Sequence, residues 1–252
     1  MFAVDGLLYK ADANGDYSYR GTDPSAYADA FDVEAGDDDL GPLISFLDFV
    51  NNSSDADFAS GLAARLNVAA FATYLAFEEL IDNFDDIDGP GNNSYLWWER
   101  GAGAMTVVAW DHNLAFGLRP GAGGGQPGAA GAAGQPGAVP NGAPPDLANP
   151  PAGFDGARPP AGGLPQGVPG QGVGAAGKGG RANALVSRFN SLADGTAKVA
   201  TAKAALKAQL ISGGVAGEAL RRRVDLIRTK AADLISTEVL TGEQQAVATY
   251  LA

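Results

Sequence analysis

Residues 83–97, with the sequence NFDDIDGPGNNSYLW, concentrate side chains that can bind a metal ion or move a proton. The segment holds three Asp, three Asn and two Gly, and Asp111 follows it within the sequence WDHN. Carboxylate and amide oxygens are hard ligands that suit Mg²⁺, which usually shares its coordination with substrate phosphates. These residues therefore indicate a divalent-metal and phosphate site, and a solvated loop in an acidic protein is the simpler alternative.

Three of these residues occur in an order that is typical of phosphoryl transfer. In that chemistry a loop supplies an Asp that accepts a hydroxyl proton and then an Asn that binds metal. A hairpin follows, and a second Asp holds the metal that bridges the phosphates. Asp85, Asn93 and Asp111 take these places in order. The spacing from Asp85 to Asn93 is longer than in ordinary protein kinases, and WDHN stands where those have DFG.

A calcium loop is a second interpretation of the same segment. The sequence DIDGPGNN is similar to calcium-binding loops of the type D-x-D-G-x-G. An EF-hand loop that begins at Asp86 would need a metal ligand at its fifth position and a Glu at its twelfth. Pro90 and Trp97 occupy these positions, which excludes an EF-hand and leaves another type of calcium loop open. His112 is the only histidine and there is no cysteine, so a zinc site is not expected.

The charge of the chain is unevenly distributed. The formal net charge is −12, with 21 acidic and 5 basic residues in 1–120, and 6 acidic and 10 basic residues in 181–252. The acidic first half argues against a nucleic-acid partner, because phosphate backbones need a cationic surface. No apolar run of about 18 residues is present, so no membrane span is predicted. The N-terminal sequence MFAVDGLLYK does not have the pattern of a signal peptide.

Composition predicts three parts of the chain, 1–118, 119–181 and 182–252. The middle part consists mostly of Gly, Ala, Pro and Gln, and is predicted to be a disordered linker. So few apolar side chains cannot offset the entropy that ordering would cost. The first part is predicted to carry the catalytic and metal loops, and the last to form a helical bundle that packs back onto the first.

Apolar residues at helical spacing predict helices on both sides of the linker, and segment 94–110 predicts a β-hairpin with glycines at its turn. The helix over 67–84 would place the Asp cluster at its C-terminal end, where the helix dipole disfavours carboxylates unless a cation compensates. The predicted fold class is α+β, mainly helical with one hairpin. The predicted helices span 40–51, 55–66, 67–84, 183–192, 196–214, 216–236 and 241–252.

Residues 71–117, FATYLAFEELIDNFDDIDGPGNNSYLWWERGAGAMTVVAWDHNLAFG, resemble the C-terminal lobe signature of the spore-coat CotH kinase family. That signature has a helix ending in an N-aromatic-D triplet, a Gly/Asn loop, an N-x-Y-L strand and a W-D-x-N-x-x-F-G ending. The resemblance extends upstream through 6–31 and 43–51, and resumes after the linker in NALVSRF and LKAQLISGGVAGEAL.

The resemblance implies an atypical protein kinase, with a mainly helical kinase-like C-terminal lobe. Such kinases transfer phosphate from ATP to Ser or Thr hydroxyls of proteins with Mg²⁺ or Mn²⁺, at the spore coat or cell surface. Asn83 and Asp85 match the N-x-D of the catalytic loop, which implies Asp85 as the base. Asn93 and Asp111 match the metal ligands. Asn93 and Trp110, which precedes the metal-binding Asp, are the implied cofactor-binding residues.

The N-terminal region departs from this family pattern. Members carry an N-terminal lobe with a phosphate-pairing Lys, whereas this chain starts near GLLYK, which resembles the segment after the adenine-binding hinge. Lys10 is therefore not expected to pair with phosphates, and the N-terminal lobe is expected to be missing. A non-catalytic coat or surface interaction protein, a pseudokinase fragment with an acidic metal-binding loop, is the alternative.

Overall fold

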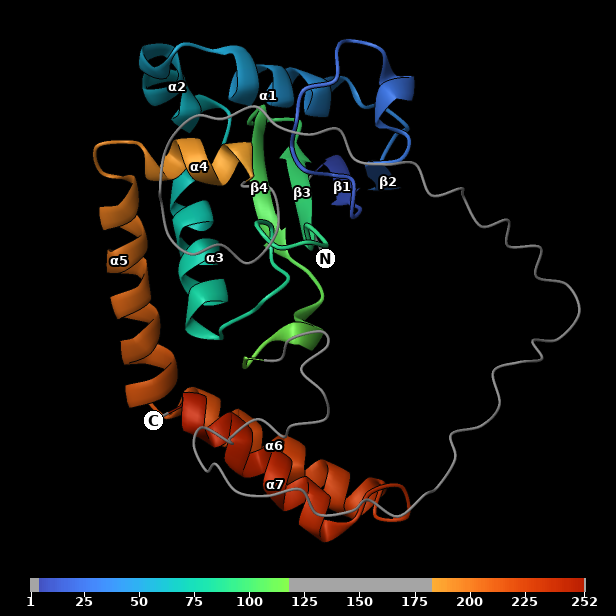
Figure 1. Ribbon diagram of the computed structural model, residues 1–252, viewed down its shortest axis with the longest axis vertical. Helices are drawn as coiled ribbons and strands as arrows, with labels where there is room; N and C mark the ends of the chain where they lie inside the picture. The colour runs from blue at the N-terminus through green and yellow to red at the C-terminus, as the bar shows by residue number, and fades with distance from the viewer. Residues whose placement is uncertain (1–4, 118–182, 252) are drawn as a thin grey trace, which may run out of the picture. The chain divides into compact units, whose positions relative to one another are not determined.

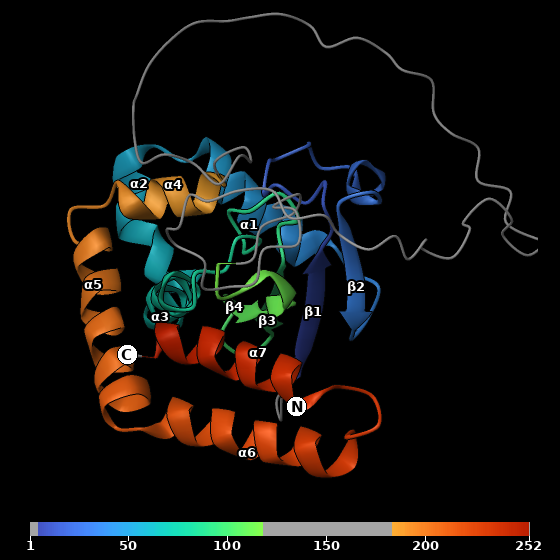
Figure 2. The ribbon, with the colours of Figure 1, turned by 60° about the horizontal axis from the view of Figure 1, so that its bottom comes forward.

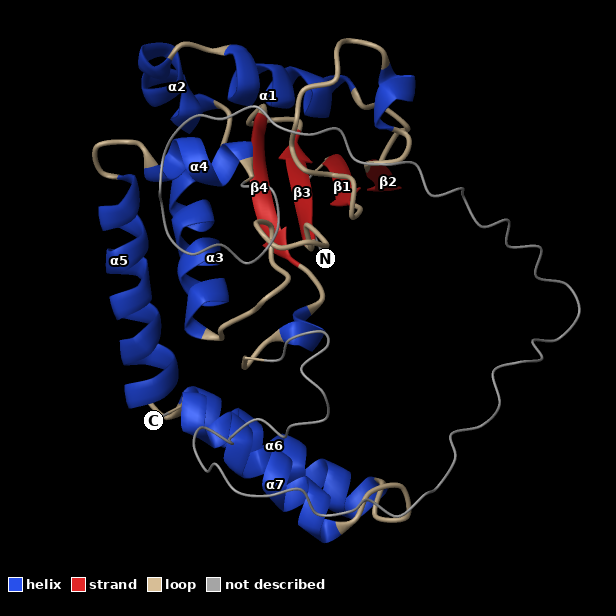
Figure 3. Cartoon of the chain, viewed as in Figure 1, coloured by secondary structure: helices blue, strands red, loops and turns tan. Residues whose placement is uncertain are grey.

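The computed structural model describes residues 5–117 and 183–251. Over these residues the predicted α+β class is confirmed, since helices pack beside one antiparallel sheet (Figure 1 and Figure 3). The predicted linker, 119–181, lies outside the described residues, and the division of the chain at its two ends stays a prediction. None of the described helices combines the length and the apolar character needed to cross a membrane.

The elements fall into three groups. The strands are β1 (Gly6–Ala11), β2 (Phe31–Ala35), β3 (Ser94–Glu99) and β4 (Ala104–Ala109). The α-helices are α1 (Gly41–Asn52), α2 (Asp55–Gly61), α3 (Val68–Leu80), α4 (Ala184–Asn190), α5 (Gly195–Leu206), α6 (Val215–Lys230) and α7 (Thr237–Tyr250). Short 3-10 or π-helical turns are η1 (Pro24–Tyr27), η2 (Leu62–Ala64), η3 (His112–Leu114) and η4 (Lys207–Ser212).

The sheet has the strand order β2-β1-β3-β4, and every neighbouring pair is antiparallel. The predicted hairpin is β3 and β4, paired from Ser94 with Ala109 to Glu99 with Ala104. Gly103 has a φ of +65°, the left-handed conformation that the turn requires and that glycine adopts without strain. Strands β1 and β2 were not predicted from the sequence. Because β1 pairs with β3, it holds a central place in the sheet that carries the site.

The predicted helix over 67–84 is wrong at its end, because α3 stops at Leu80. Asp82 adopts a left-handed φ of +47°, its N–H donates to Glu79 O at 3.3 Å, and the Asn83 N–H donates to Glu78 O at 3.1 Å. These are the two hydrogen bonds of a Schellman cap, which satisfies the last carbonyls and turns the chain out of the helix. The acidic cluster therefore lies in a loop after the helix.

Other helix boundaries also differ from the prediction. The helix over 55–66 ends at Gly61 and continues as the 3-10 turn η2. The helix over 216–236 ends at Lys230, and α7 begins at Thr237. Ser236 causes the early start of α7, because its Oγ accepts the Val239 N–H at 3.3 Å and so caps the new helix.

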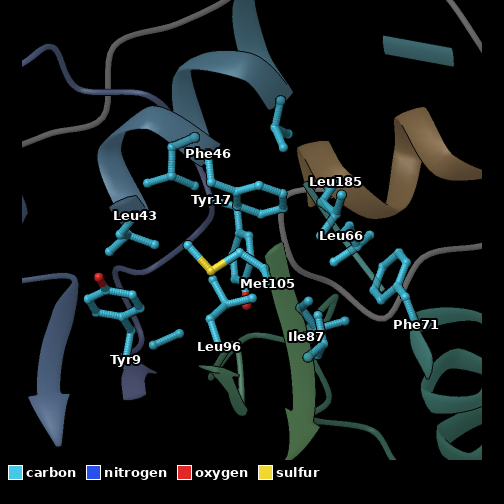
Figure 4. Close-up of a cluster of buried hydrophobic side chains, with 14 of the residues drawn as sticks. Tyr9, Tyr17, Leu43, Phe46, Leu66, Phe71, Ile87, Leu96, Met105 and Leu185 are labelled. Carbon is cyan, nitrogen blue, oxygen red and sulfur yellow. The ribbon is translucent and has the colours of Figure 1, made fainter. Parts of the chain in front are cut away.

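The hydrophobic core joins residues from both described ranges (Figure 4). Leu96 of β3 and Met105 of β4 lie on the covered face of the sheet, and α1 contributes Phe46. Leu185 of α4 is fully buried in the same cluster, and Phe189 of that helix meets the Phe71 ring edge-on at 5.0 Å between centroids. The segment after the predicted linker therefore completes the core around the sheet.

Arg188 ties α4 to the first helices. Its Nη1 donates to Val50 O at 2.8 Å and to Ser53 Oγ at 3.0 Å, and its guanidinium lies 4.2 Å from the Phe58 ring centroid. The side chain is only 18% exposed. A charged donor that is held in this way contributes more than a surface ion pair.

We expect Arg188→Met to lower the free energy of unfolding by about 2 kcal/mol, because the main-chain acceptor of Val50 loses a charged donor. Urea denaturation followed by circular dichroism measures this change. Arg228→Met is the matched control, since Arg228 is 48% exposed and, among the residues that the structure describes, pairs only with Asp225 of its own helix. If both variants lost the same free energy of unfolding, the proposed role of Arg188 would be contradicted.

Candidate active site

The Asp85 carboxylate is fixed by the loop that follows it. Its Oδ1 accepts the Gly91 N–H, and its Oδ2 accepts Asn93 Nδ2 at 3.0 Å. A Cβ at position 91 would overlap with this carboxylate, so the close approach requires glycine. The glycine turn thus orients both oxygens of Asp85 and brings Asn93 against it.

Asn83 is fully buried and connects the loop to α3. Its Nδ2 donates to Glu78 Oε2 at 2.9 Å, and its Oδ1 accepts the Asp85 N–H at 3.4 Å. The structure therefore brings three of the predicted site residues, Asn83, Asp85 and Asn93, into one hydrogen-bonded group. In this group Asn83 holds the main chain of Asp85, and Asn93 holds its side chain.

Other polar residues of the loop make structural hydrogen bonds, and two of these reach distant parts of the chain. Asp88 Oδ1 accepts the Asn183 N–H at 2.7 Å, just before α4 begins. Asn92 is buried, and its Nδ2 donates to Ala13 O at 2.9 Å. Asp86 Oδ1 accepts the Asp88 N–H at 3.0 Å. These contacts give the abundance of Asp and Asn in the loop a structural reason beside any role in binding metal.

The second loop begins at the end of β4. Asp111 is exposed, has a left-handed φ of +52°, and its carboxylate accepts the Asn113 N–H at 3.3 Å. Trp110 is 41% exposed and meets the Tyr95 ring edge-on at 5.0 Å between centroids, on the side of the hairpin. Within the described residues, no hydrogen bond joins Asp111 to Asp85 or Asn93 directly.

Main-chain hydrogen bonds hold the two loops side by side. The Phe84 N–H donates to Leu114 O at 3.2 Å, the Phe116 N–H to Ile81 O at 2.6 Å, and the Gly117 N–H to Asp82 O at 3.2 Å. The segment after Asp111 therefore runs along the segment that contains Asn83. A displacement of one loop must disturb the other.

Backbone strain is concentrated in these two loops. Among the described non-glycine residues, five have a positive φ, and four of them are Asp82 (+47°), Asn92 (+51°), Asp111 (+52°) and Phe116 (+58°). For a bulky residue such as Phe116 this conformation is a true outlier. Residues of this kind persist only where surrounding contacts impose the conformation, and they cluster at functional sites.

Glu78 connects the two loops, and this role was not predicted from the sequence. This carboxylate is 1% exposed; its Oε2 accepts from Asn83, and its Oε1 lies 3.1 Å from His112 Nε2. It therefore joins the loop of Asp85 to the residue next to Asp111. The sequence did contain a sign of this role. Glu78 lies between Ala76 and Leu80 in the most apolar predicted helix, and a carboxylate that is buried there needs a polar partner.

His112 responds to this buried carboxylate. Its hydrogen bond to Glu78 raises the pKa of the imidazole above its ordinary value of 6.5, and the charges of Glu78 and Asp111 act in the same direction. The Phe77 ring contacts the imidazole edge-on at 5.6 Å between centroids. The positive form of His112 therefore completes an ion pair with Glu78.

We expect this pair to make stability depend on pH. Because the folded pKa is raised, the contribution of His112 is fully present below about pH 6.5 and is lost as pH rises through the higher folded pKa. Urea unfolding at a series of pH values, in the presence of EDTA, measures how the free energy of unfolding depends on pH. His112 is the chain's only histidine, so His112→Gln should flatten the curve in this range. An unchanged curve in that variant would contradict the assignment.

The predicted metal ligands are one exposed carboxylate, Asp111, and one amide, Asn93. Asn93 donates its Nδ2 to Asp85, so its Oδ1 is the atom suited to a cation. Hard oxygen donors of these types fit Mg²⁺ or Mn²⁺. Across the parts of the chain that the structure describes, no three His, Cys, Asp or Glu side chains form a group that could hold a metal ion.

Comparison with known proteins identifies the family of this chain. A family model described as CotH kinase protein matches residues 2–139, more than half of the 252 residues. The chain therefore belongs to the CotH kinase family. The matched range contains every predicted site residue, from Asn83 to Asp111. A search of curated proteins returned no match.

Proposed function

We propose that this chain provides the catalytic and metal-binding loops of an atypical protein kinase that transfers phosphate from ATP to Ser or Thr hydroxyls of a protein. The observation that supports this most is the group of Asn83, Asp85 and Asn93, held beside the Asp111 loop by main-chain hydrogen bonds. Membership of a family of kinase proteins supports the same chemistry. A coat or surface protein is the proposed substrate, in line with the family's association with the spore coat.

Asp85 is the proposed base. As the substrate oxygen bonds to the γ-phosphorus and the bond to the leaving ADP oxygen breaks, the hydroxyl proton passes to the Asp85 carboxylate. Each carboxylate oxygen has two acceptor positions, so Asp85 can accept this proton while Gly91 and Asn93 keep its orientation. The rigid loop thus contributes positioning, which is the main demand of phosphoryl transfer.

Asp111 and Asn93 are the proposed ligands of Mg²⁺ or Mn²⁺. The bound ion would neutralise charge on the phosphates of ATP during transfer. Asn93 has a double role in this proposal, because the same amide donates to Asp85 and offers its oxygen to the ion. Trp110 is proposed to lie beside the bound nucleotide, where its exposed ring is available for contact.

The test is phosphate transfer by the full chain with ATP, Mn²⁺ or Mg²⁺ and a protein rich in Ser and Thr, measured by mass spectrometry. We expect phosphoserine or phosphothreonine that disappears on addition of EDTA and in Asp111→Asn. Metal binding by calorimetry is measured in parallel. Metal binding that requires Asp111 without any phosphate transfer would contradict the kinase proposal and favour a non-catalytic surface interaction protein.

A further inference from the structure

An apolar cavity of about 550 Å³ lies between the end of α3, Phe116 and the C-terminal helices. Its lining includes Phe77 and Leu80 of α3, Leu210 of η4 and Val247 of α7. Figure 2 shows α6 and α7 running alongside each other. A packed protein interior leaves few voids larger than a water molecule, whereas ligand pockets measure about 300–1,000 Å³.

Two polar groups lie among the apolar walls. Arg223 of α6, which is exposed, is the only charged residue among the described residues that line the cavity, and Tyr250 of α7 brings a hydroxyl group. Within the described residues Arg223 has no ion-pair partner, whereas Arg228 of the same helix binds Asp225 at 2.7 Å. The site therefore combines an apolar surface with one available cation.

This combination matches the chemistry of a fatty acid. Apolar surface that faces water is unfavourable in proportion to its area, and an acyl chain in the cavity would cover it. A guanidinium binds a carboxylate through two parallel hydrogen bonds, which gives the head group a defined place. The basic composition of residues 181–252 favours an anionic ligand over a cationic one.

We propose that this cavity binds a single-chain fatty acid, with the acyl chain between α3 and α7 and the carboxylate at Arg223. The site is separate from the group around Asp85. Phe116 belongs to its wall and also to the loop that follows Asp111, so the two sites share one structural element. The proposal does not depend on phosphate transfer, because binding alone defines it.

Calorimetric titration of the full chain with dodecanoate, below its micelle concentration, tests the proposal. We expect saturable binding of one molecule per chain, with a dissociation constant on the order of 10 µM. Arg223→Gln should weaken dodecanoate binding about tenfold, because a charged hydrogen bond is lost. Arg221→Gln makes the same charge change on the same helix outside the cavity, and should stay within about twofold of the wild type.

Two further measurements separate a defined site from general attraction. Dodecanol lacks the carboxylate, so its affinity should be equal in the wild type and in Arg223→Gln. Ala219 lines the cavity and is exposed, so Ala219→Phe should fill the space and abolish dodecanoate binding without changing the thermal midpoint. Three results would each overturn the proposal. Dodecanoate could bind only as micelles, the two arginine variants could lose affinity equally, or a folded Ala219→Phe protein could bind dodecanoate as well as the wild type.

Discussion

Asp85→Asn is expected to lower the rate of phosphate transfer about a thousandfold, in the range that a positioned general base contributes. The amide has almost the same shape as the carboxylate, and its oxygen can still accept the Gly91 N–H, whereas its NH₂ group cannot accept the hydrogen bond from Asn93. It cannot take up the proton of the substrate hydroxyl. The loss should therefore appear mainly in the rate of the chemical step.

Asp88→Asn is the matched control for this prediction. Asp88 lies in the same loop, but its carboxylate accepts the Asn183 N–H, which an amide oxygen can also accept. Initial rates for the wild type and the two variants at saturating ATP give the comparison. If Asp85→Asn transferred phosphate as fast as Asp88→Asn, Asp85 would not be the base.

Glu78→Leu is expected to lower the free energy of unfolding by about 3 kcal/mol, because it removes a charged hydrogen-bond acceptor from a buried polar residue. Asn83 is fully buried and would lose the acceptor of its Nδ2, and His112 would lose its ion-pair partner. Glu78→Gln keeps an acceptor for Asn83 without the charge. This variant should be less destabilised, and the pKa of His112 should fall towards its ordinary value.

Urea unfolding measures the stability of both variants, and NMR titration of the imidazole measures the pKa. Glu79→Leu is the control, since the Glu79 side chain is 60% exposed and its pair with Lys203 is at the surface. Its cost should be less than about 1 kcal/mol. A Glu78→Leu protein as stable as Glu79→Leu would show that the Glu78 bridge does not hold the two loops.

Local sequence patterns predicted the elements whose partners are close in sequence. The hairpin of β3 and β4 needs only a glycine turn, and both strands carry the expected residues. In contrast, β1 pairs with β3 across about 90 residues, as in Gly6 with Glu99. Alternation over six residues does not reveal such a partner, so the strand was missed.

The end of α3 escaped prediction for a different reason. Apolar residues at helical spacing continue past Leu80 to Ile81 and Phe84, so the periodicity gives no sign of an end. The helix ends because Asp82 takes a left-handed conformation that is uncommon for residues other than glycine. The cap depends on the main-chain hydrogen bond from Asn83 to Glu78, and the buried side chain of Asn83 holds this residue in place.

Contacts within the candidate site were predictable to the extent that they are local. Asp85 and Asn93 are eight residues apart across a glycine turn, and the structure joins them. The structural roles of Asp88 and Asn92 depend on Asn183 and Ala13, which are 95 and 79 residues away in the sequence. The sequence therefore indicated a polar cluster correctly but could not separate its candidate catalytic members from those that anchor the loop.

A crystal structure of the chain with Mn²⁺ and a nucleotide, with the ion located by its anomalous scattering, is the most direct test of this account. We expect one ion with the Asp111 carboxylate and the Asn93 amide oxygen at about 2 Å, and the Asp85 carboxylate beside the γ-phosphate. The account would be contradicted if the carboxyl groups of Asp85 and Asp111 were more than about 12 Å apart with no ion between them. That distance is several times the reach of a coordination bond.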